Sequence, residues 1–295
     1  EDPLVSVITS ISIDHTAFLG STIPEIAAHK AGIIKSRRPV VYDDSSPEAA
    51  AVIFAKAKEM KSEGFPVTPD EVRRGIRTRL VKSPDPVDPG VAGHQEMSFS
   101  YCGEEILFEI PFAAPYQLMN AALAIRALEV SGLPVAPEQA AEGVKKAKWP
   151  ARMEEISSGV YLDGAHNADG IRAFLDAACR LKELRKPDHV RILFAVSADK
   201  DHQRMLREIA ERLKPDLWIL SKMESHRTLS VEDLEAAAEK LRAEYGEETE
   251  YRVSRDVKRA VKELLGLHGE RDLSLIAGSL YLAGEVKEQI SKSTS

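Results

Sequence analysis

The chain has 295 residues, a length typical of two domains, and its 40 Lys and Arg against 47 Asp and Glu give a net charge of −7. This acidic balance argues against nucleic acid or an anionic membrane surface as the main partner. Apolar residues at 43% and charged residues at 29% exclude a collagen-like or disordered protein. Two cysteines without metal-binding spacing exclude a disulfide framework and a zinc site, so we expect a protein of the reducing cytoplasm.

Strands and helices alternate over the first 64 residues. Residues 4–13 form a β-branched run that is typical of a buried strand. Thr22 and Glu25 form a capping box, which predicts a helix that runs to about Gly32. A second strand and helix are expected over residues 39–42 and 46–64. The alternation predicts an α/β protein with a parallel sheet, and no apolar run approaches the roughly 20 residues that cross a bilayer.

The pattern changes after residue 64 and again near residue 148. Residues 65–113 carry short alternating runs and clusters of Pro and Gly, which predict antiparallel strands. Two helices are expected next, over residues 117–131 and 137–146. We therefore place a first domain at residues 1–147 and a second, Rossmann-like domain with a mostly parallel sheet at residues 148–295. The expected strands of the second domain are residues 159–163, 189–196, 216–221, 249–253 and 272–277, and helical patterns lie between them.

Two side chains of the first domain are candidates for chemistry. His15 follows the first expected strand, where open α/β sheets place ligands, although a single His in such a loop is more often a hydrogen-bonded structural residue. Lys30 lies among small residues on the following helix, and a solvated helical lysine is the simpler interpretation.

Two more candidates follow strands of the second domain. Asp163 to Asn167 lie between a strand and a helix, whose N-terminus could hold an anionic group together with His166. The simpler interpretation is that Asn167 caps this helix. Ser279 occupies the same topological place after the last expected strand.

Six segments, in linear order, resemble one family. They are ITSISIDHTAFLGSTIPEIAAHKAGIIK (8–35), YQLMNAALAIRALE (116–129), WPARMEE (149–155), YLDGAHNADG (161–170), ADKD (198–201) and GSLYLAGEVK (278–287). The chain resembles the folylpolyglutamate synthases, including the bifunctional dihydrofolate synthases, of the Mur ligase superfamily. The resemblance implies the back part of a P-loop-type central ATPase domain, followed by a C-terminal glutamate-binding domain.

The resemblance also implies residue roles. His15 is a magnesium ligand and Lys30 is a carbamylated lysine, whose anionic oxygens suit a hard cation such as Mg²⁺. Such a lysine must lose its proton first, so its pocket is expected to disfavour the ammonium form. Nucleotide contacts fall on Asn120, Arg152 and Asp163, with Arg152 on phosphate and the other two near the adenosine. His166 and Ser279 are implied contacts of the incoming glutamate.

The implied activity is an ATP-dependent ligation. ATP would phosphorylate a carboxylate of folate or tetrahydrofolate, or of dihydropteroate, and the amine of L-glutamate would attack the acyl phosphate. The expected partners are thus ATP, L-glutamate and folate or folylpolyglutamate, with Mg²⁺ as cofactor, and the protein is expected to be a monomer. Two alternatives stay open: a non-catalytic module that binds a nucleotide or an amino acid, and a Mur-type ligase with another substrate.

The chain departs from the family pattern in two ways. The family has Gly where this chain has Ser12, Ala114 and Ala151, and a loop shifts if one of those glycines has a positive φ. The phosphate loop Gly-x-x-x-x-Gly-Lys-Ser/Thr is missing, since no glycine here precedes a lysine. The family's second acidic metal ligand would precede Leu4. The sequence therefore looks like the C-terminal two-thirds of a synthase, and we expect it to be inactive alone.

Overall fold

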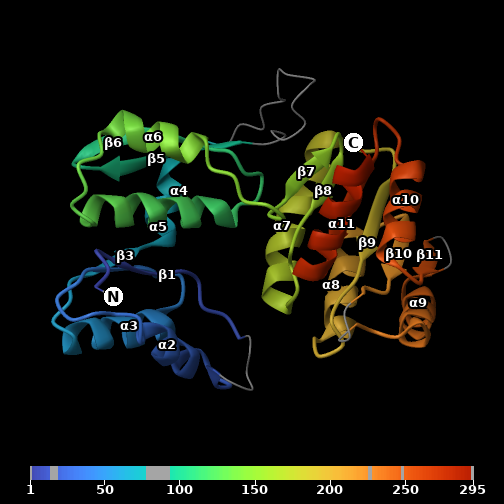
Figure 1. Cartoon of the computed structure of the whole chain (residues 1–295), viewed down its shortest axis with the longest axis horizontal. Helices are drawn as coiled ribbons and strands as arrows, with labels where there is room; N and C mark the ends of the chain where they lie inside the picture. Colours follow the sequence, from blue (N-terminus) through green and yellow to red (C-terminus); the bar gives the residue numbers. More distant parts are fainter. Residues whose placement is uncertain (1, 14–18, 78–93, 225–227, 247–248, 294–295) are drawn as a thin grey trace. The chain divides into compact units, whose positions relative to one another are not determined.

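The computed structural model describes residues 2–13, 19–77, 94–224, 228–246 and 249–293. The chain forms two compact units, which we call unit 1 (residues 1–82 and 93–148) and unit 2 (residues 83–92 and 149–295). Each unit has its own sheet structure and apolar core (Figure 1). None of the helices in the described ranges is both long enough and apolar enough to cross a membrane.

Unit 1 contains a parallel sheet in the order β1-β2-β3. Its strands are β1 (Ser6–Ile8), β2 (Val40–Asp43) and β3 (Gly64–Val67). On one face, α2 (Ile23–Ala31) and α3 (Pro47–Glu59) share an apolar cluster with Tyr42. Val41, the residue before Tyr42 in β2, points to the other face of the sheet and packs with α5 (Tyr116–Val130). The sheet is therefore covered by helices on both faces, as parallel sheets usually are.

The first helices begin at the predicted caps. Thr22 Oγ1 accepts a hydrogen bond from Glu25 N (3.4 Å), and the Glu25 carboxylate accepts one from Thr22 N (3.1 Å), which completes the capping box. Ser46 Oγ accepts from Ala49 N (3.3 Å) at the start of α3. The strand expected over residues 4–13 is shorter, because only Ser6–Ile8 find ladder partners in β2.

A second sheet of unit 1 is antiparallel, in the order β4-β5-β6. It consists of β4 (Ile76–Arg77), β5 (Gln95–Tyr101) and β6 (Glu104–Ile110), with α4 (Pro69–Gly75) against β5 and α6 (Pro137–Lys145) against β6. The prediction of antiparallel strands is correct for residues 95–110 and wrong for residues 65–75. There, β3 runs parallel to β2, and Thr68 Oγ1 accepts from Glu71 N (3.1 Å) to begin α4.

Unit 2 contains a sheet in the order β11-β10-β9-β12-β8-β7. Its strands are β7 (Glu154–Ser157), β8 (Val160–Leu162), β9 (Val190–Phe194), β10 (Leu217–Ser221), β11 (Glu250–Ser254) and β12 (Leu273–Ala277). All pairs are parallel except β7 with β8, an antiparallel hairpin that the sequence pattern did not predict. The expected α/β class with a mostly parallel second sheet is confirmed.

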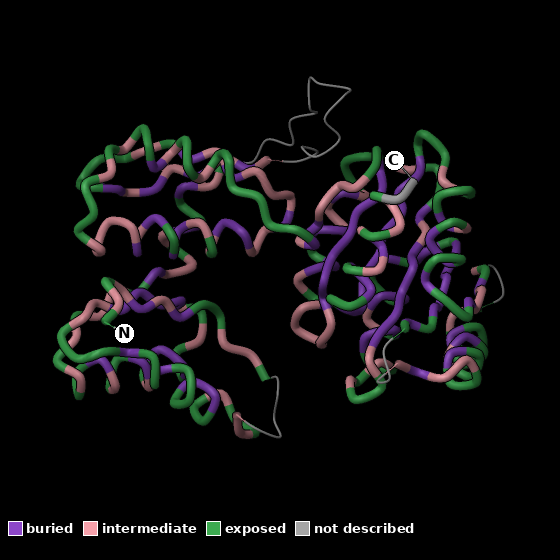
Figure 2. The backbone as a smooth tube through the Cα atoms, viewed as in Figure 1, coloured by how far each residue is buried: buried purple, intermediate pink, exposed green. Residues whose placement is uncertain are grey.

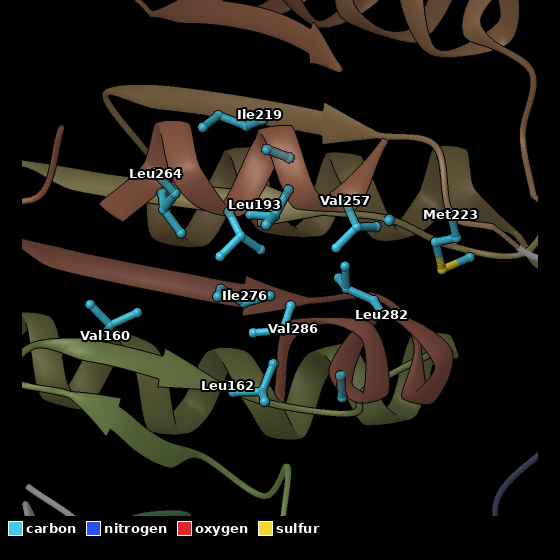
Figure 3. Close-up of a cluster of buried hydrophobic side chains, with 14 of the residues drawn as sticks. Val160, Leu162, Leu193, Ile219, Met223, Val257, Leu264, Ile276, Leu282 and Val286 are labelled. Carbon is cyan, nitrogen blue, oxygen red and sulfur yellow. The ribbon is translucent and has the colours of Figure 1, made fainter. Parts of the chain in front are cut away.

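Helices cover both faces of this sheet. They are α7 (Ala168–Arg185), α8 (His202–Leu213), α9 (Val231–Tyr245), α10 (Val257–Leu267) and α11 (Leu280–Ser293). Helices α10 and α11 share one apolar cluster with the sheet, in which Leu193, Ile219 and Ile276 point toward Leu264 and Val286 (Figure 3). Helices α7, α8 and α9 pack side by side on the other face. Strands β10 and β12 are therefore buried along their whole length, and β9 is buried at every residue except Arg191 (Figure 2).

Candidate functional site

The candidate site lies at the carboxyl ends of β8 and β12, which are neighbouring parallel strands. After β8 the chain enters α7 on one face of the sheet, and after β12 it enters α11 on the other face. Adjacent strands whose helices depart to opposite faces leave a crevice at their carboxyl ends, where open α/β sheets bind ligands.

Two helix N-termini meet this edge, and both are capped. Asn167 Oδ1 accepts a hydrogen bond from Gly170 N (2.7 Å) at the start of α7. Ser279 Oγ accepts from Tyr281 N (3.1 Å) at the start of α11. The capping interpretation of Asn167 is thus confirmed, and Ser279, which is 3% exposed, has the same local role. Each N-terminus also carries a partial positive charge that favours anions.

Asp163 ties the loops of this edge together. Its side chain is 3% exposed, and its two oxygens accept hydrogen bonds from Met153 N (2.8 Å) and Ala165 N (2.8 Å). The loop before β7 is therefore pinned to the end of β8. The nucleotide contact implied for Asp163 stays a prediction, because the structure gives this carboxylate a role in holding the backbone.

The loop before β7 has an unusual backbone. Ala151 has φ of 55° and Met153 has φ of 48°, so both residues that flank Arg152 are left-handed. This conformation is rare for residues with a side chain. Ala151 stands where the related family has glycine, and it keeps the positive φ that a glycine adopts easily. The expected shift of this loop relative to a protein with glycine here stays a prediction.

Arg152 is half-buried and lies over Gly164. A Cβ atom at position 164 would lie 3.2 Å from Arg152 Nη1 and 2.3 Å from Leu280 Cδ2, so both side chains lie directly over this glycine. Across the described ranges, no hydrogen bond or ion pair engages the Arg152 guanidinium. A half-buried guanidinium at this edge is suited to bind a phosphate or a carboxylate.

His166 is placed in the same turn. Its Nδ1–H donates to the carbonyl oxygen of Gly164 (2.9 Å), which orients the ring. The loop of Ser279 is joined to this turn because Gly278 N donates to Ala165 O (2.9 Å). The structure thus brings together the four candidates of unit 2: Arg152, Asp163, His166 and Ser279.

The structure does not bring Lys30 and Asn120, the described candidates of unit 1, close together. Lys30 is exposed in the last turn of α2, and Asn120 is exposed on α5, where its amide donates to Gln117 Oε1 (2.8 Å). These helices lie on opposite faces of the β1-β2-β3 sheet, and no interaction between the two side chains occurs in the described residues. His15 lies outside the described residues.

A magnesium site needs several oxygen or nitrogen donors close together. In those parts of the chain, no three His, Cys, Asp or Glu side chains gather in a way that could hold a metal ion. Lys30 is exposed in the last turn of α2, and no ion pair between described residues places a carboxylate beside it. The described residues by themselves therefore do not fit a magnesium site, and the carbamate on Lys30 stays a prediction.

Glu154 belongs to this site but was not singled out from the sequence. Its Oε2 accepts from Ala151 N (2.7 Å), and its Oε1 pairs with Lys287 Nζ on α11 (2.7 Å). The segments WPARMEE and GSLYLAGEVK contain both residues, but nothing in the sequence pattern indicates that they pair.

A surface cavity of about 210 Å³ lies elsewhere in unit 2, between α8 and α9. Its lining includes Leu206 and Leu241 with the charged side chains of Asp233 and Lys240. None of the candidate residues lines it. We regard the edge of β8 and β12 as the functional site, because the chemical groups converge there.

Comparisons with known proteins concern the chain as a whole. Residues 151–280 match the Mur ligase, glutamate ligase domain. Folylpolyglutamate synthase of Lacticaseibacillus casei is 34% identical over 215 residues, 69% of this chain and 45% of the relative. Dihydrofolate synthase/folylpolyglutamate synthase of Bacillus subtilis is 30% identical over 298 residues, 98% of this chain and 63% of the relative.

A solved structure extends the likeness to the whole described fold. Escherichia coli FolC, in complex with DHPP and ADP, superposes with a TM-score of 0.72 at 26% identity, over 100% of this chain and 63% of that one. The chain spans less than two-thirds of the length of these proteins. The glutamate ligase domain at residues 151–280 and the similarity along the chain show that it is homologous to the folylpolyglutamate and dihydrofolate synthases.

Proposed function

We propose that this chain is part of an ATP-dependent ligase that adds L-glutamate to folate or tetrahydrofolate. One observation carries the proposal: the Arg152 guanidinium lies without a partner among the described residues, at an edge where α7 and α11 begin, in a glutamate ligase domain. The names of the relatives supply the substrate class, and the E. coli structure contains ADP.

The chemistry needs positioning and charge neutralisation more than a nucleophile. A carboxylate oxygen of the folate attacks the γ-phosphorus of ATP, the bond from phosphorus to ADP breaks, and an acyl phosphate forms. The amine of glutamate then attacks the acyl carbon, and phosphate leaves as the amide forms. Both steps bring anions together, so Arg152 would neutralise charge on the transferred phosphate.

The glutamate would bind beside this arginine. Its two carboxylates require donors, and His166, the Ser279 hydroxyl and the helix N-termini are donors of the right kind. Asn120 and Asp163 remain the proposed contacts near the adenosine. Mg²⁺, with His15 and Lys30 as proposed ligands, would supply further charge neutralisation when bound, and dihydropteroate is a proposed additional acceptor.

A second candidate is a non-catalytic module that binds a nucleotide or an acidic amino acid through unit 2. One observation favours it: no glycine of the 295 residues is followed by lysine, so these residues do not contain the Gly-Lys pair of a phosphate loop. A Mur-type ligase with another substrate is a weaker candidate, because the relatives named above are synthases of folate compounds.

The test joins this chain to the part of the Bacillus subtilis relative that lies outside the match. ADP release should then require both L-glutamate and a reduced folate. Arg152→Ala should lower kcat/KM by about a hundredfold or more, because a donor to developing negative charge is lost. Arg271→Ala is the control, since Arg271 pairs with Asp188 at the amino end of β12 and has no place at the site.

Three results decide between the candidates. Full activity of the Arg152→Ala protein would refute the proposed role of Arg152. Turnover by the unjoined chain at about 1 per second or faster would show that the missing phosphate loop is not essential. ADP binding by the unjoined chain, together with an inactive joined protein, would favour the non-catalytic module.

A further inference from the structure

The loop that carries Arg152 cannot hold its conformation by itself. Ala151 and Met153 are both left-handed, and neither has the freedom of glycine. Residues in such conformations persist only where neighbouring groups impose them, and they often occur at functional sites. The groups that impose this conformation therefore also decide where the Arg152 guanidinium lies.

Among the described residues, these hydrogen bonds hold the loop. Gly164 N donates to Ala151 O (2.9 Å), and Met153 N donates to Asp163 Oδ2 (2.8 Å), so two of the bonds come from the end of β8. The third is donated by Ala151 N to Glu154 Oε2 (2.7 Å). Glu154 is thus the group that holds the amide of the left-handed alanine.

The Glu154 carboxylate is itself anchored. Its other oxygen pairs with Lys287 Nζ (2.7 Å), about two turns after Ser279 on α11. The carboxylate therefore bridges the Arg152 loop and the helix whose N-terminus borders the site. Glu154 thus links the loop of Arg152, the candidate for phosphate binding, to α11, the helix that follows the glutamate-binding candidate Ser279.

We propose that Glu154, fixed by Lys287, is a positioning residue for Arg152. It keeps Ala151 in the left-handed conformation, which holds the guanidinium over Gly164. The inference rests on the proposed function in one respect, namely that the proposed function supplies the phosphate that Arg152 binds. The position of the loop can be measured without any ligand.

A simpler view is that Glu154 and Lys287 form an ordinary surface ion pair. Their side chains are 28% and 41% exposed, and pairs of this kind usually contribute little. The pair of Glu263 with Arg252 (2.6 Å) is a matched case, since Glu263 is also 28% exposed and holds no left-handed residue. Glu263→Gln is therefore the control for Glu154→Gln.

The experiment uses the 295-residue chain and two readouts. The first is amide hydrogen exchange at Ala151 and Met153, and the second is the Kd for ADP from calorimetric titration. Glu154→Gln and Lys287→Met should each speed exchange at Ala151 at least tenfold and weaken ADP binding at least fivefold. Glu263→Gln should change neither, and circular dichroism checks that each variant is folded.

A rescue separates positioning from general stability. Glycine adopts the left-handed conformation without strain, so Ala151→Gly added to Glu154→Gln should bring ADP binding back to within about twofold of the parent chain. An ion pair that only stabilises the fold predicts no such recovery. The inference is overturned if exchange at Ala151 does not respond to Glu154→Gln, or if the glycine gives no recovery.

Failure of the proposed function would look different. Arg152→Ala would then leave the Kd for ADP unchanged, or the parent chain would not bind ADP, while exchange at Ala151 still responds to Glu154→Gln. In that case the loop measurement alone upholds the role of Glu154, and the assignment of Arg152 to phosphate is rejected.

Discussion

At the scale of single residues, the candidate site separates side chains that hold the backbone from those that are suited to a ligand. Asp163, Asn167 and Ser279 each accept hydrogen bonds from main-chain N–H groups. Arg152 and His166 are oriented over or beside Gly164, at the carboxyl ends of the strands. Substitution of Asn167 should therefore affect stability first, substitution of Arg152 or His166 should affect binding, and substitution of Ser279, whose hydroxyl both caps α11 and is a proposed donor to glutamate, should affect both.

His166→Ala tests this distinction in the joined protein. We expect the KM for L-glutamate to rise by about ten- to a hundredfold, because a charge-assisted hydrogen bond is lost, whereas the KM for ATP changes little. Asn167→Ala is the control and should lower the free energy of unfolding by about 1 kcal/mol without changing the glutamate dependence. Steady-state kinetics with each substrate varied separately, beside urea unfolding, checks both. An effect of His166→Ala on ATP alone would contradict its assignment.

Asp272 predicts a pH dependence of stability. Burial alone would raise the pKa of this carboxyl, but the hydrogen bond from Gly269 N and the guanidinium of Arg191 hold the pKa below its usual value. Because the pKa is lower in the folded state, this stabilisation is complete above about pH 4 and is lost as the pH falls through the folded-state value.

Asp272→Asn should therefore lower the free energy of unfolding by about 3 kcal/mol at pH 7, since it leaves the half-buried Arg191 without its partner. The variant should also show a flatter pH dependence below pH 4. Urea unfolding at a series of pH values measures both, with Asp188→Asn as the exposed control. If the free energy of unfolding falls below pH 4 as steeply in Asp272→Asn as in the parent chain, Asp272 does not cause that fall.

At the scale of elements, helix starts were predictable because their signals are local. Thr22, Ser46 and Asn167 all cap helices that the sequence predicted. The antiparallel β7 was not predicted, because its pairing with β8 depends on a tertiary contact. Residues 65–75 were assigned to the wrong pattern, although Thr68 and Glu71 form a local helix start there. This local signal lies close to the Pro and Gly clusters, which favour turns and strands in the same segment.

Gly75 tests the packing of α4 on the antiparallel sheet. A Cβ at this position would lie 2.0 Å from the carbonyl oxygen of Ser98 on β5, which is backbone and cannot move aside cheaply. Gly75→Ala should therefore lower the free energy of unfolding by about 2 kcal/mol. Gly143 on α6 has no atom within 4 Å of its Cβ position, so Gly143→Ala should raise stability by about 1 kcal/mol. Equal effects in urea unfolding would contradict this account.

At the scale of the whole molecule, the sequence was a better guide to residues that directly follow strands than to pairs of residues that lie far apart in the chain. His166 and Ser279 became candidates because they follow expected strands, whereas Arg152 was implied only by the resemblance, and the structure places all three at one edge of the sheet. Glu154 was missed because its partner Lys287 is 133 residues away in the chain. A contact of that separation leaves no periodic or local signal in one sequence.

Unit 2 should fold by itself, because its six-stranded sheet and its core are formed by residues 149–295. We expect a fragment of these residues to unfold cooperatively in urea and to keep the near-ultraviolet circular dichroism of Trp218, which stacks on Tyr251. A fragment without cooperative unfolding would show that unit 2 depends on the rest of the chain.

The two tryptophans of the chain lie in opposite surroundings. Trp218 is 1% exposed on β10, whereas Trp149 is 64% exposed, three residues before Arg152. The fluorescence of the unmodified protein therefore has two components, a blue one from Trp218 that iodide cannot quench and a red one from Trp149 that it can. Titrating a ligand while following the quenchable component would report on the Arg152 loop without any label, and the protected component would report that the sheet beneath it is intact.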